Sequence, residues 1–205
     1  KNLHTYSAGN ANAIWHDAGR AVTPDGKTAL MIGTGDIGSH FARLCKAVGM
    51  ETIGVRRNPS IEAEGIDHVV GFESLDNVLQ YADVIAMSVP STPATRHLLD
   101  TKRIASLKPH AIIINAGRGN AIESRALADA LAEGRIRGAA LDVTEPEPLP
   151  ANSPLWCEPK CLITPHVAGG NHLEITERSI ISIALGNVRC YANGQSLDNR
   201  MPLKG

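Results

Sequence analysis

TALMIGTGDIG, residues 28–38, decides the fold of this chain. Its first five residues predict a strand, and the turn after them places glycines at 33, 35 and 38 in the spacing G-x-G-x-x-G. Gly33 permits a tight turn, Gly35 lets the backbone approach a pyrophosphate, and Gly38 allows the next helix to pack closely on the strand. The start of that helix offers free N–H groups and the positive end of its dipole to phosphates. The motif therefore predicts a dinucleotide-binding turn.

The residues after the turn supply the context that this motif requires. Ile37, Phe41, Leu44 and Val48 recur at spacings of four, three and four, which indicates one face of a helix. A strand before the glycines and an amphipathic helix behind them favour a binding turn. The alternative is a flexible glycine turn that binds nothing.

Short apolar runs alternate with helical patterns from Lys27 to about Ile163. This alternation predicts a doubly wound α/β domain around a parallel sheet, with strands buried on both faces. The predicted strands are Thr28–Ile32, Thr52–Val55, Asp67–Val70, Val84–Ser88, Ala111–Asn115, Ala139–Val143 and Cys161–Thr164. Further helices are predicted around Leu75–Leu79, Ser124–Gly134 and Leu173–Tyr191.

The composition is that of an ordinary globular protein, with 43% hydrophobic and 20% charged residues. A net charge of −1 argues against nucleic acid or an anionic membrane as partner. No apolar run approaches the roughly 20 residues of a membrane span. The cysteines lack zinc-finger spacing, so we expect no metal site, and we expect free thiols in a reducing cytoplasm. They are Cys45, Cys157, Cys161 and Cys190.

The second predicted strand is followed by Arg56 and Arg57. An NAD site usually places an acidic residue here, which accepts hydrogen bonds from the adenosine ribose. A guanidinium would instead bind the 2′-phosphate of NADP. We therefore expect the chain to prefer NADP(H). The alternative is that both arginines are solvated surface charges and that NAD(H) binds as well.

Three later strands are each followed by polar residues that suit carbonyl reduction. Arg118 lies on a glycine-flanked loop, three carboxylates follow at 142, 145 and 147, and His166 follows the last strand. The arginine would orient a substrate carboxylate, and the histidine, with a Glu favouring its charged form, would protonate the carbonyl oxygen. Singly, such residues are more often surface charges or structural histidines. Their placement on successive strand ends indicates a site.

Several stretches make the chain resemble the cofactor domain of the D-isomer-specific 2-hydroxyacid dehydrogenases, which is of the Rossmann type. The stretches are residues 33–38, 47–50, 88–96, 115–119, 142–149 and 164–170. The resemblance implies an oxidoreductase that transfers a hydride between NAD(P)H and a short 2-keto acid or D-2-hydroxy acid. Arg56 and Arg57 are shared by NADP-using branches such as the glyoxylate and hydroxypyruvate reductases.

The resemblance also implies roles for single residues. Arg118 would bind the substrate, Glu147 would pair with the histidine, and His166 would be the catalytic acid and base, which leaves Glu145 without a role. The residues implied to contact the cofactor are Asp36 and Ile37 at the pyrophosphate, Pro90, Thr95 and Asp142 at the nicotinamide, and Ala116 and Gly169 beside the nicotinamide ribose and ring.

Family members also have a substrate domain, built mainly from residues before the cofactor domain, and we expect it to be missing here. Residues 1–190 would form the dinucleotide-binding domain, with 1–22 as an interdomain helix or arm. Residues 191–205 would be a tail that returns to the absent domain. Because that domain closes the cleft against water, we expect the chain alone to bind cofactor but to turn over little or nothing.

A non-enzymatic function is the main alternative. The C-terminal-binding corepressors resemble this family, retain the Arg, Glu and His, and sense nucleotide by dimerising. The chain shows no appended disordered or peptide-binding segment, which favours an enzyme. A formate dehydrogenase would carry a glutamine in place of Glu147. By the same resemblance, we expect a homodimer paired through the cofactor domain.

Overall fold

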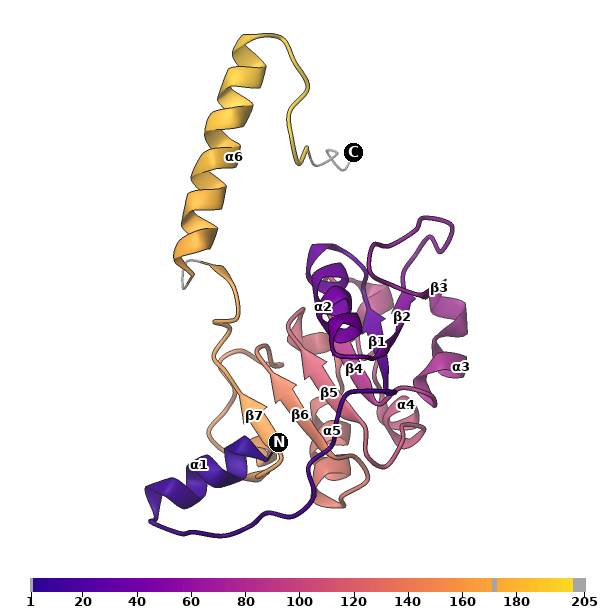
Figure 1. The fold of residues 1–205 in the computed structure, drawn as a ribbon, viewed down its shortest axis with the longest axis vertical. Helices are drawn as coiled ribbons and strands as arrows, with labels where there is room; N and C mark the ends of the chain where they lie inside the picture. The colour runs from indigo at the N-terminus through magenta and orange to yellow at the C-terminus, as the bar shows by residue number, and fades with distance from the viewer. Residues whose placement is uncertain (1, 171–172, 201–205) are drawn as a thin grey trace. The chain divides into compact units, whose positions relative to one another are not determined.

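The computed structural model describes residues 2–170 and 173–200. The chain divides into two compact units, one ending at Pro165 and the other beginning at His166, and each is described by itself. A parallel sheet with helices makes up the first unit, and one long helix dominates the second (Figure 1). The end of the expected tail, residues 201–205, lies outside the described residues, and the expected boundary near residue 190 stays a prediction.

Seven parallel strands form one sheet in the order β3-β2-β1-β4-β5-β6-β7. The strands are β1 (Thr28–Ile32), β2 (Glu51–Val55), β3 (His68–Val70), β4 (Val84–Met87), β5 (Ile112–Asn115), β6 (Gly138–Leu141) and β7 (Cys161–Ile163). Each predicted strand overlaps an observed one, so the prediction of a doubly wound parallel sheet is confirmed. The strand order reverses between β1 and β4, and ligands of such sheets bind at the carboxyl ends beside that point.

The helices lie where the sequence predicts them, with one addition. They are α1 (Leu3–Ala11), α2 (Asp36–Ala47), α3 (Leu75–Leu79), α4 (Thr101–Ala105), α5 (Ser124–Ala132) and α6 (Glu174–Ala192). Short 3₁₀ turns cover Phe72–Ser74, Pro93–Thr95, Gly119–Ala121 and Pro154–Cys157. Helix α4 was not predicted, because its five residues include a single large apolar side chain, Ile104, and so show no apolar spacing. Its N-cap, Asp100, accepts a hydrogen bond from the Arg103 N–H at 2.8 Å.

Helix α2 begins at the glycine turn as predicted, but of the four residues in its apolar stripe only Phe41 packs against the core. The buried residues of the helix are Gly38, Ala42 and Cys45. The larger apolar side chains at 37, 44 and 48 are exposed. Small side chains let the helix lie close to β1, as a phosphate-binding turn requires. The pattern therefore predicted the helix correctly but not the side that is buried.

Helices cover both faces of the sheet. On one face, Ile85 and Ile113 of the central strands share a core with Leu127 of α5 and with apolar residues of α3 and α4. On the other face, Met31 of β1 packs with Ala42 of α2. Helices on both faces of one parallel sheet are what defines a doubly wound fold.

Strands β4 and β5 are fully covered on only one side within the first unit. Ile85 and Ile113 are completely buried, whereas Ala86 and Ile114 on the opposite face remain partly exposed. Helix α2 contacts β1 and β2, and a groove is lined by residues of β4, β5, β6 and β7. Among the described residues of this unit, β4 and β5 are therefore fully buried on one face only, and their burial on the other face stays a prediction.

Helix α6, in the second unit, carries large apolar side chains on several sides. Ile175, Ile180, Leu185 and Val188 are each more than half exposed. None of the helices that the structure describes is long and apolar enough to cross a membrane.

Candidate functional site

The glycine turn lies at the carboxyl end of β1, beside β4. Gly33 has a φ of +97°, and a Cβ there would lie 2.9 Å from the Ser88 carbonyl oxygen. A Cβ at Gly38 would overlap the Gly33 carbonyl oxygen, so close packing requires both glycines. A Cβ at Gly35 would meet nothing within 4 Å, which leaves open space where α2 begins.

Polar groups around this space fit an anionic ligand. The Oγ1 of Thr34 is buried and has no hydrogen-bond partner among the described residues. Gly35 is the N-cap of α2, and no described side chain caps this helix start. The first N–H groups of a helix lack intrahelical partners and favour anions such as a diphosphate. The predicted cofactor residues Asp36 and Ile37 form the first turn here.

The two arginines after β2 are engaged differently. Arg56 Nη1 donates to the carbonyl oxygens of Ile61 at 3.0 Å and Glu62 at 3.3 Å, and so braces the loop that leads to β3. Arg57 is exposed and has no hydrogen bond or ion pair with any described residue. Of the two guanidinium groups, that of Arg57 is the one available to a bound phosphate.

Pro90 and Thr95, which were predicted to line the nicotinamide, contact each other on the loop after β4. The Thr95 hydroxyl donates to the Pro90 carbonyl oxygen at 2.6 Å and accepts from the Thr92 N–H at 2.9 Å. Thr95 is only 7% exposed. Its hydroxyl is therefore used inside the loop, where it holds Pro90 in place.

Arg118 is positioned by a buried asparagine whose role the sequence did not reveal. Asn115, 1% exposed at the end of β5, accepts from the Gly117 N–H at 3.0 Å and donates to the Arg118 carbonyl oxygen at 3.0 Å. These bonds shape the turn that contains Ala116 and Arg118. The guanidinium Nη1 of Arg118 donates to the Gly117 carbonyl oxygen at 2.7 Å. In the sequence, the signal for this role was an amide side chain directly after three isoleucines.

Two of the carboxylates after β6 are tied to their surroundings. Asp142 Oδ1 accepts from the Thr164 hydroxyl at 2.6 Å, which joins the ends of β6 and β7. Glu147 Oε1 accepts from the Thr144 N–H at 3.0 Å, so this carboxylate turns back toward the end of β6.

His166 opens the second unit in an uncommon backbone conformation. Its φ is +56°, in the left-handed region that a residue with a Cβ rarely adopts. Such outliers concentrate at binding and catalytic sites. Gly169 follows three residues later. The structure thus brings Arg118 and Glu147 into one unit and places His166 and Gly169 in the other.

Glu145, left without a role by the resemblance, has two side-chain partners. Its carboxylate binds Arg96 at 2.6 Å and His97 at 3.3 Å. The hydrogen bond from Arg96 is the main reason that the pKa of Glu145 is lowered. These partners are 49 and 48 residues away in the chain, a separation at which no local spacing rule applies.

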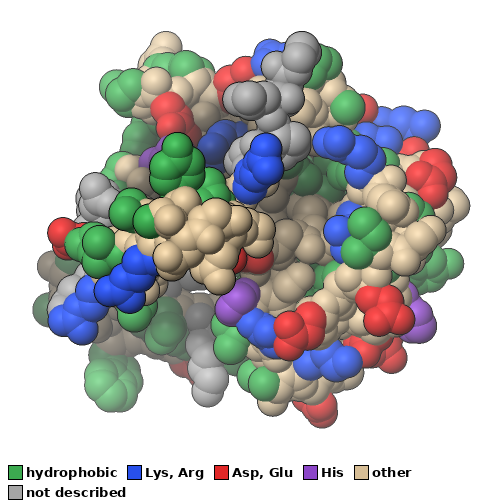
Figure 2. Space-filling view, turned by 90° about the horizontal axis from the view of Figure 1, so that it is seen from above, with side chains coloured by type: hydrophobic (Ala, Val, Ile, Leu, Met, Phe, Trp, Pro, Cys, Tyr) green, Lys and Arg blue, Asp and Glu red, His purple; other side chains and the backbone are tan. Residues whose placement is uncertain are grey.

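Charges of both signs are interspersed over the face seen from above in Figure 2. Lys and Arg side chains lie among Asp and Glu side chains and do not gather in one basic patch there.

The chain was then compared with known proteins. Residues 1–168 match the family model described as D-isomer specific 2-hydroxyacid dehydrogenase, NAD binding domain. The glyoxylate reductase of Aeropyrum pernix is 36% identical over 182 residues, which cover 87% of this chain and 53% of that protein. The chain therefore spans about half the length of this curated relative.

Solved structures agree in fold. A D-isomer specific 2-hydroxyacid dehydrogenase family protein from Aeromonas salmonicida is 38% identical with a TM-score of 0.85, and the match covers 98% of this chain and 63% of that one. A D-isomer specific 2-hydroxyacid dehydrogenase from Xanthobacter autotrophicus, in complex with NADPH and MES, is 30% identical with a TM-score of 0.82, covering 98% and 80%.

Proposed function

The chain belongs to the D-isomer-specific 2-hydroxyacid dehydrogenases through their NAD-binding domain, and on that premise we propose that it is the cofactor-binding part of an enzyme that interconverts short 2-keto acids and D-2-hydroxy acids. The observation that carries the proposal is the glycine turn, open at Gly35 and closed at Gly33 and Gly38, at the point where the strand order reverses. Arg118 and Glu147 follow neighbouring strands of the same sheet edge.

The glycine turn would hold the diphosphate of the cofactor. Backbone N–H groups at the start of α2 and the unpartnered Thr34 hydroxyl supply hydrogen-bond donors there. The loop that joins Pro90 to Thr95, together with Ala116, Asp142 and Gly169, would line the nicotinamide end. When bound, the cofactor supplies the hydride of the reaction.

The proton and the substrate would be handled by three side chains. Arg118 would exchange its bond to the Gly117 carbonyl for a two-point contact with the substrate carboxylate. His166 would donate a proton from a ring nitrogen to the substrate carbonyl oxygen, and would accept it in the oxidative direction. Glu147 would accept a hydrogen bond from the other ring nitrogen and so orient the imidazole.

NADP(H) is the cofactor that the end of β2 favours. Arg57 is exposed and without a described partner, and no carboxylate stands at positions 56 and 57 to repel a 2′-phosphate. The NADPH complex of the relative from Xanthobacter autotrophicus supports this choice by analogy. NAD(H) remains the alternative ligand of the same turn.

A second copy of the chain is the protein partner that we propose. Ile14 and Trp15, directly after α1, are 56% and 102% exposed, and such apolar side chains are usually covered in an assembly. A homodimer would cover them. Light scattering on wild type and on Trp15→Ala would test this, because a monomeric wild type would contradict it.

The unpaired cysteines among the described residues suit a reducing cytoplasm.

The function is tested by assaying the complete enzyme on a panel of 2-keto acids with NADPH and NADH. His166→Ala should lower kcat by about 10²- to 10⁴-fold, the usual contribution of a positioned acid or base, and leave NADPH affinity unchanged. His68→Ala, on the exposed edge strand β3, is the matched control and should behave as wild type. Full activity of His166→Ala would overturn the assignment.

A further inference from the structure

Three loops leave the sheet at the carboxyl ends of β4, β5 and β6, and each carries residues of the proposed site. Thr95 stands on the first loop, Arg118 on the second and Glu147 on the third. Groups that act together need a fixed spacing, since a displacement of about 1 Å can cost about 10²-fold in rate. The contacts that set the spacing of these loops therefore bear on turnover.

The second loop touches both of its neighbours. A Cβ at Gly119 would overlap the Thr144 carbonyl, so the second and third loops are in direct backbone contact. The carbonyl oxygen of Asn120 accepts from the His97 N–H at 2.8 Å, and its side-chain Nδ2 donates to Ser91 Oγ at 2.7 Å. These bonds join the second loop to the first.

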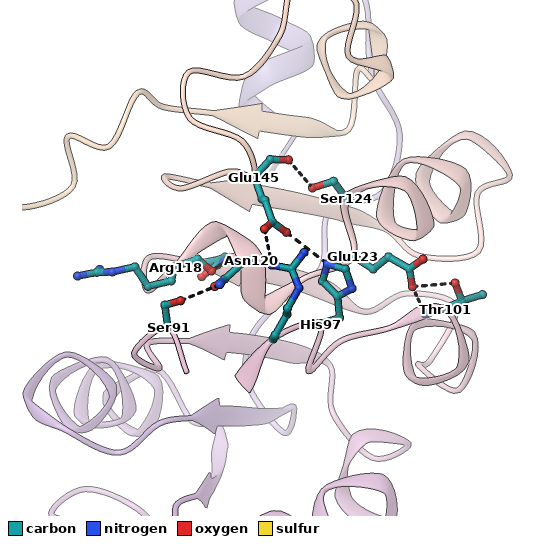
Figure 3. Close-up of polar contacts among 10 residues, drawn as sticks. Ser91, His97, Thr101, Arg118, Asn120, Glu123, Ser124 and Glu145 are labelled. Carbon is teal, nitrogen blue, oxygen red and sulfur yellow. Dashed lines mark hydrogen bonds and ion pairs between the residues drawn. The ribbon is translucent and has the colours of Figure 1, made fainter. Parts of the chain in front are cut away.

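Glu145 joins the third loop to the first with both carboxylate oxygens (Figure 3). Oε1 accepts from Arg96 Nη1 at 2.6 Å, and Oε2 lies 3.3 Å from His97 Nε2. The backbone carbonyl oxygen of Glu145 accepts from Ser124 Oγ at 3.3 Å. The Glu145 side chain is 30% exposed, less than those of Arg96 at 53% and His97 at 40%.

The side chains of Glu145 and Arg118 point in different directions. In Figure 3 the Arg118 side chain extends away from Glu145 and His97. His97 has a φ of +47°, so its backbone is held in the left-handed region directly beside Thr95. The Glu145 carboxylate therefore binds the segment that carries Thr95, whereas the Arg118 side chain points away from it.

We propose that Glu145 is a positioning residue, which holds the loop of Thr95 at a fixed distance from the loops of Arg118 and Glu147 by binding Arg96 and His97. The inference rests on the proposed function, because the nicotinamide end of the cofactor would lie on these three loops. Glu145 itself contacts neither substrate nor cofactor.

The test compares Glu145→Gln with Glu123→Gln. Glu123 is a matched control because it lies in the same region, where it accepts from the Thr101 N–H at 2.9 Å and from the Thr101 hydroxyl at 3.0 Å (Figure 3). Its carboxylate joins the start of α4 to the residue before α5, and among the described contacts none links it to Glu145. Each substitution removes one negative charge and keeps the shape of the side chain.

The first readout uses this chain and NADPH alone. Glu145→Gln should bind NADPH with the affinity of wild type, because the diphosphate turn is untouched, and should change the fluorescence of the bound nicotinamide. The second readout uses the complete enzyme, in which kcat for 2-keto acid reduction should fall about tenfold while KM changes much less. Glu123→Gln should match wild type in both readouts.

A double-mutant cycle isolates the link to Arg96. Arg96→Ala combined with Glu145→Ala should lower kcat no further than the more severe single variant, because both remove the same contact. Additive losses would overturn the proposed link. A lower unfolding midpoint in Glu145→Gln with unchanged kcat and unchanged nicotinamide fluorescence would overturn the positioning role.

The two proposals fail in different ways. If the complete wild-type enzyme binds NADPH but reduces no 2-keto acid, the enzymatic function is contradicted, and the fluorescence comparison on this chain still decides the role of Glu145. If wild type binds neither NADPH nor NADH, both proposals are overturned.

Discussion

At the scale of single residues, the end of β2 separates two neighbouring arginines by their contacts. Arg56 bonds to the carbonyl oxygens of its own loop at 3.0 and 3.3 Å, whereas Arg57 has no partner among the described residues. The two neighbouring arginines therefore differ in their contacts. Arg56 shapes the loop, and Arg57 is the arginine that we propose for a 2′-phosphate.

Arg57→Ala should weaken NADPH binding about 10- to 100-fold, because hydrogen bonds to a charged group contribute about 1.5–3 kcal/mol. It should leave NADH binding unchanged, since NADH has no 2′-phosphate. Arg56→Ala is the matched control and should affect both cofactors alike. Fluorescence titration with NADPH and NADH measures these effects, and equal losses for both cofactors in Arg57→Ala would contradict the contact.

Asp67 links the start of β2 to helix α2 and makes the fold sensitive to acid. A hydrogen bond from Lys46 at 2.6 Å and another from the Thr52 hydroxyl at 2.8 Å lower the pKa of Asp67 to about 2. The pKa is lower in the folded chain than the roughly 3.9 of an unfolded one. The carboxylate therefore stabilises the fold above about pH 4, and this contribution is lost as the pH falls toward about 2.

Asp67→Asn should consequently flatten the decline in the free energy of unfolding between about pH 4 and 2. Urea unfolding followed at several pH values measures that slope. Asp129→Asn is the matched control, because Asp129 forms a local ion pair with Arg125 within α5 and its side chain is 42% exposed. A decline as steep in Asp67→Asn as in wild type would show that another group is responsible.

At the scale of elements, the close contact between β1 and α2 depends on small residues. Gly38 leaves no room for a Cβ beside the Gly33 carbonyl oxygen, and Ala42 and Cys45 continue the buried side of the helix. Gly35, by contrast, borders open space. The glycines of one motif thus serve two purposes, namely packing and access for a ligand.

Gly38→Ala and Gly35→Ala should separate these purposes. Gly38→Ala should destabilise the fold by about 1–3 kcal/mol, because it overpacks the contact between helix and strand. Gly35→Ala should change stability by about 1 kcal/mol or less, as expected for an N-cap position. It should nevertheless reduce NADPH affinity, because its methyl group would stand where the diphosphate approaches. Urea unfolding and NADPH titration measure both effects, and wild-type binding by Gly35→Ala would refute the diphosphate site.

At the scale of the whole molecule, the residues proposed for catalysis are divided between the two units. Arg118 and Glu147 belong to the unit that ends at Pro165, and His166 begins the other. The chain also spans only about half the length of the glyoxylate reductase that it matches. Binding of cofactor and turnover of substrate should therefore be separable.

The chain by itself should bind NADPH but reduce 2-keto acids at least about 10²-fold more slowly than the complete enzyme, because water exclusion and substrate alignment depend on closure of a full cleft. Parallel NADPH titrations and steady-state assays on the two proteins measure this. The complete enzyme serves as the control. Equal kcat values would mean that the residues present here suffice for catalysis.

Much of the fold and part of the candidate site could be predicted from the sequence alone. Apolar runs, helical spacing and glycine positions are local patterns, so they predicted the seven strands, the turn at Gly33–Gly38 and the strand ends that carry Arg118 and Glu147. Long-range contacts follow no such pattern. Two features could be found only in the tertiary structure, namely the small residues on the buried side of α2 and the contact of Glu145 with Arg96. Each depends on segments that meet only after the sheet has formed.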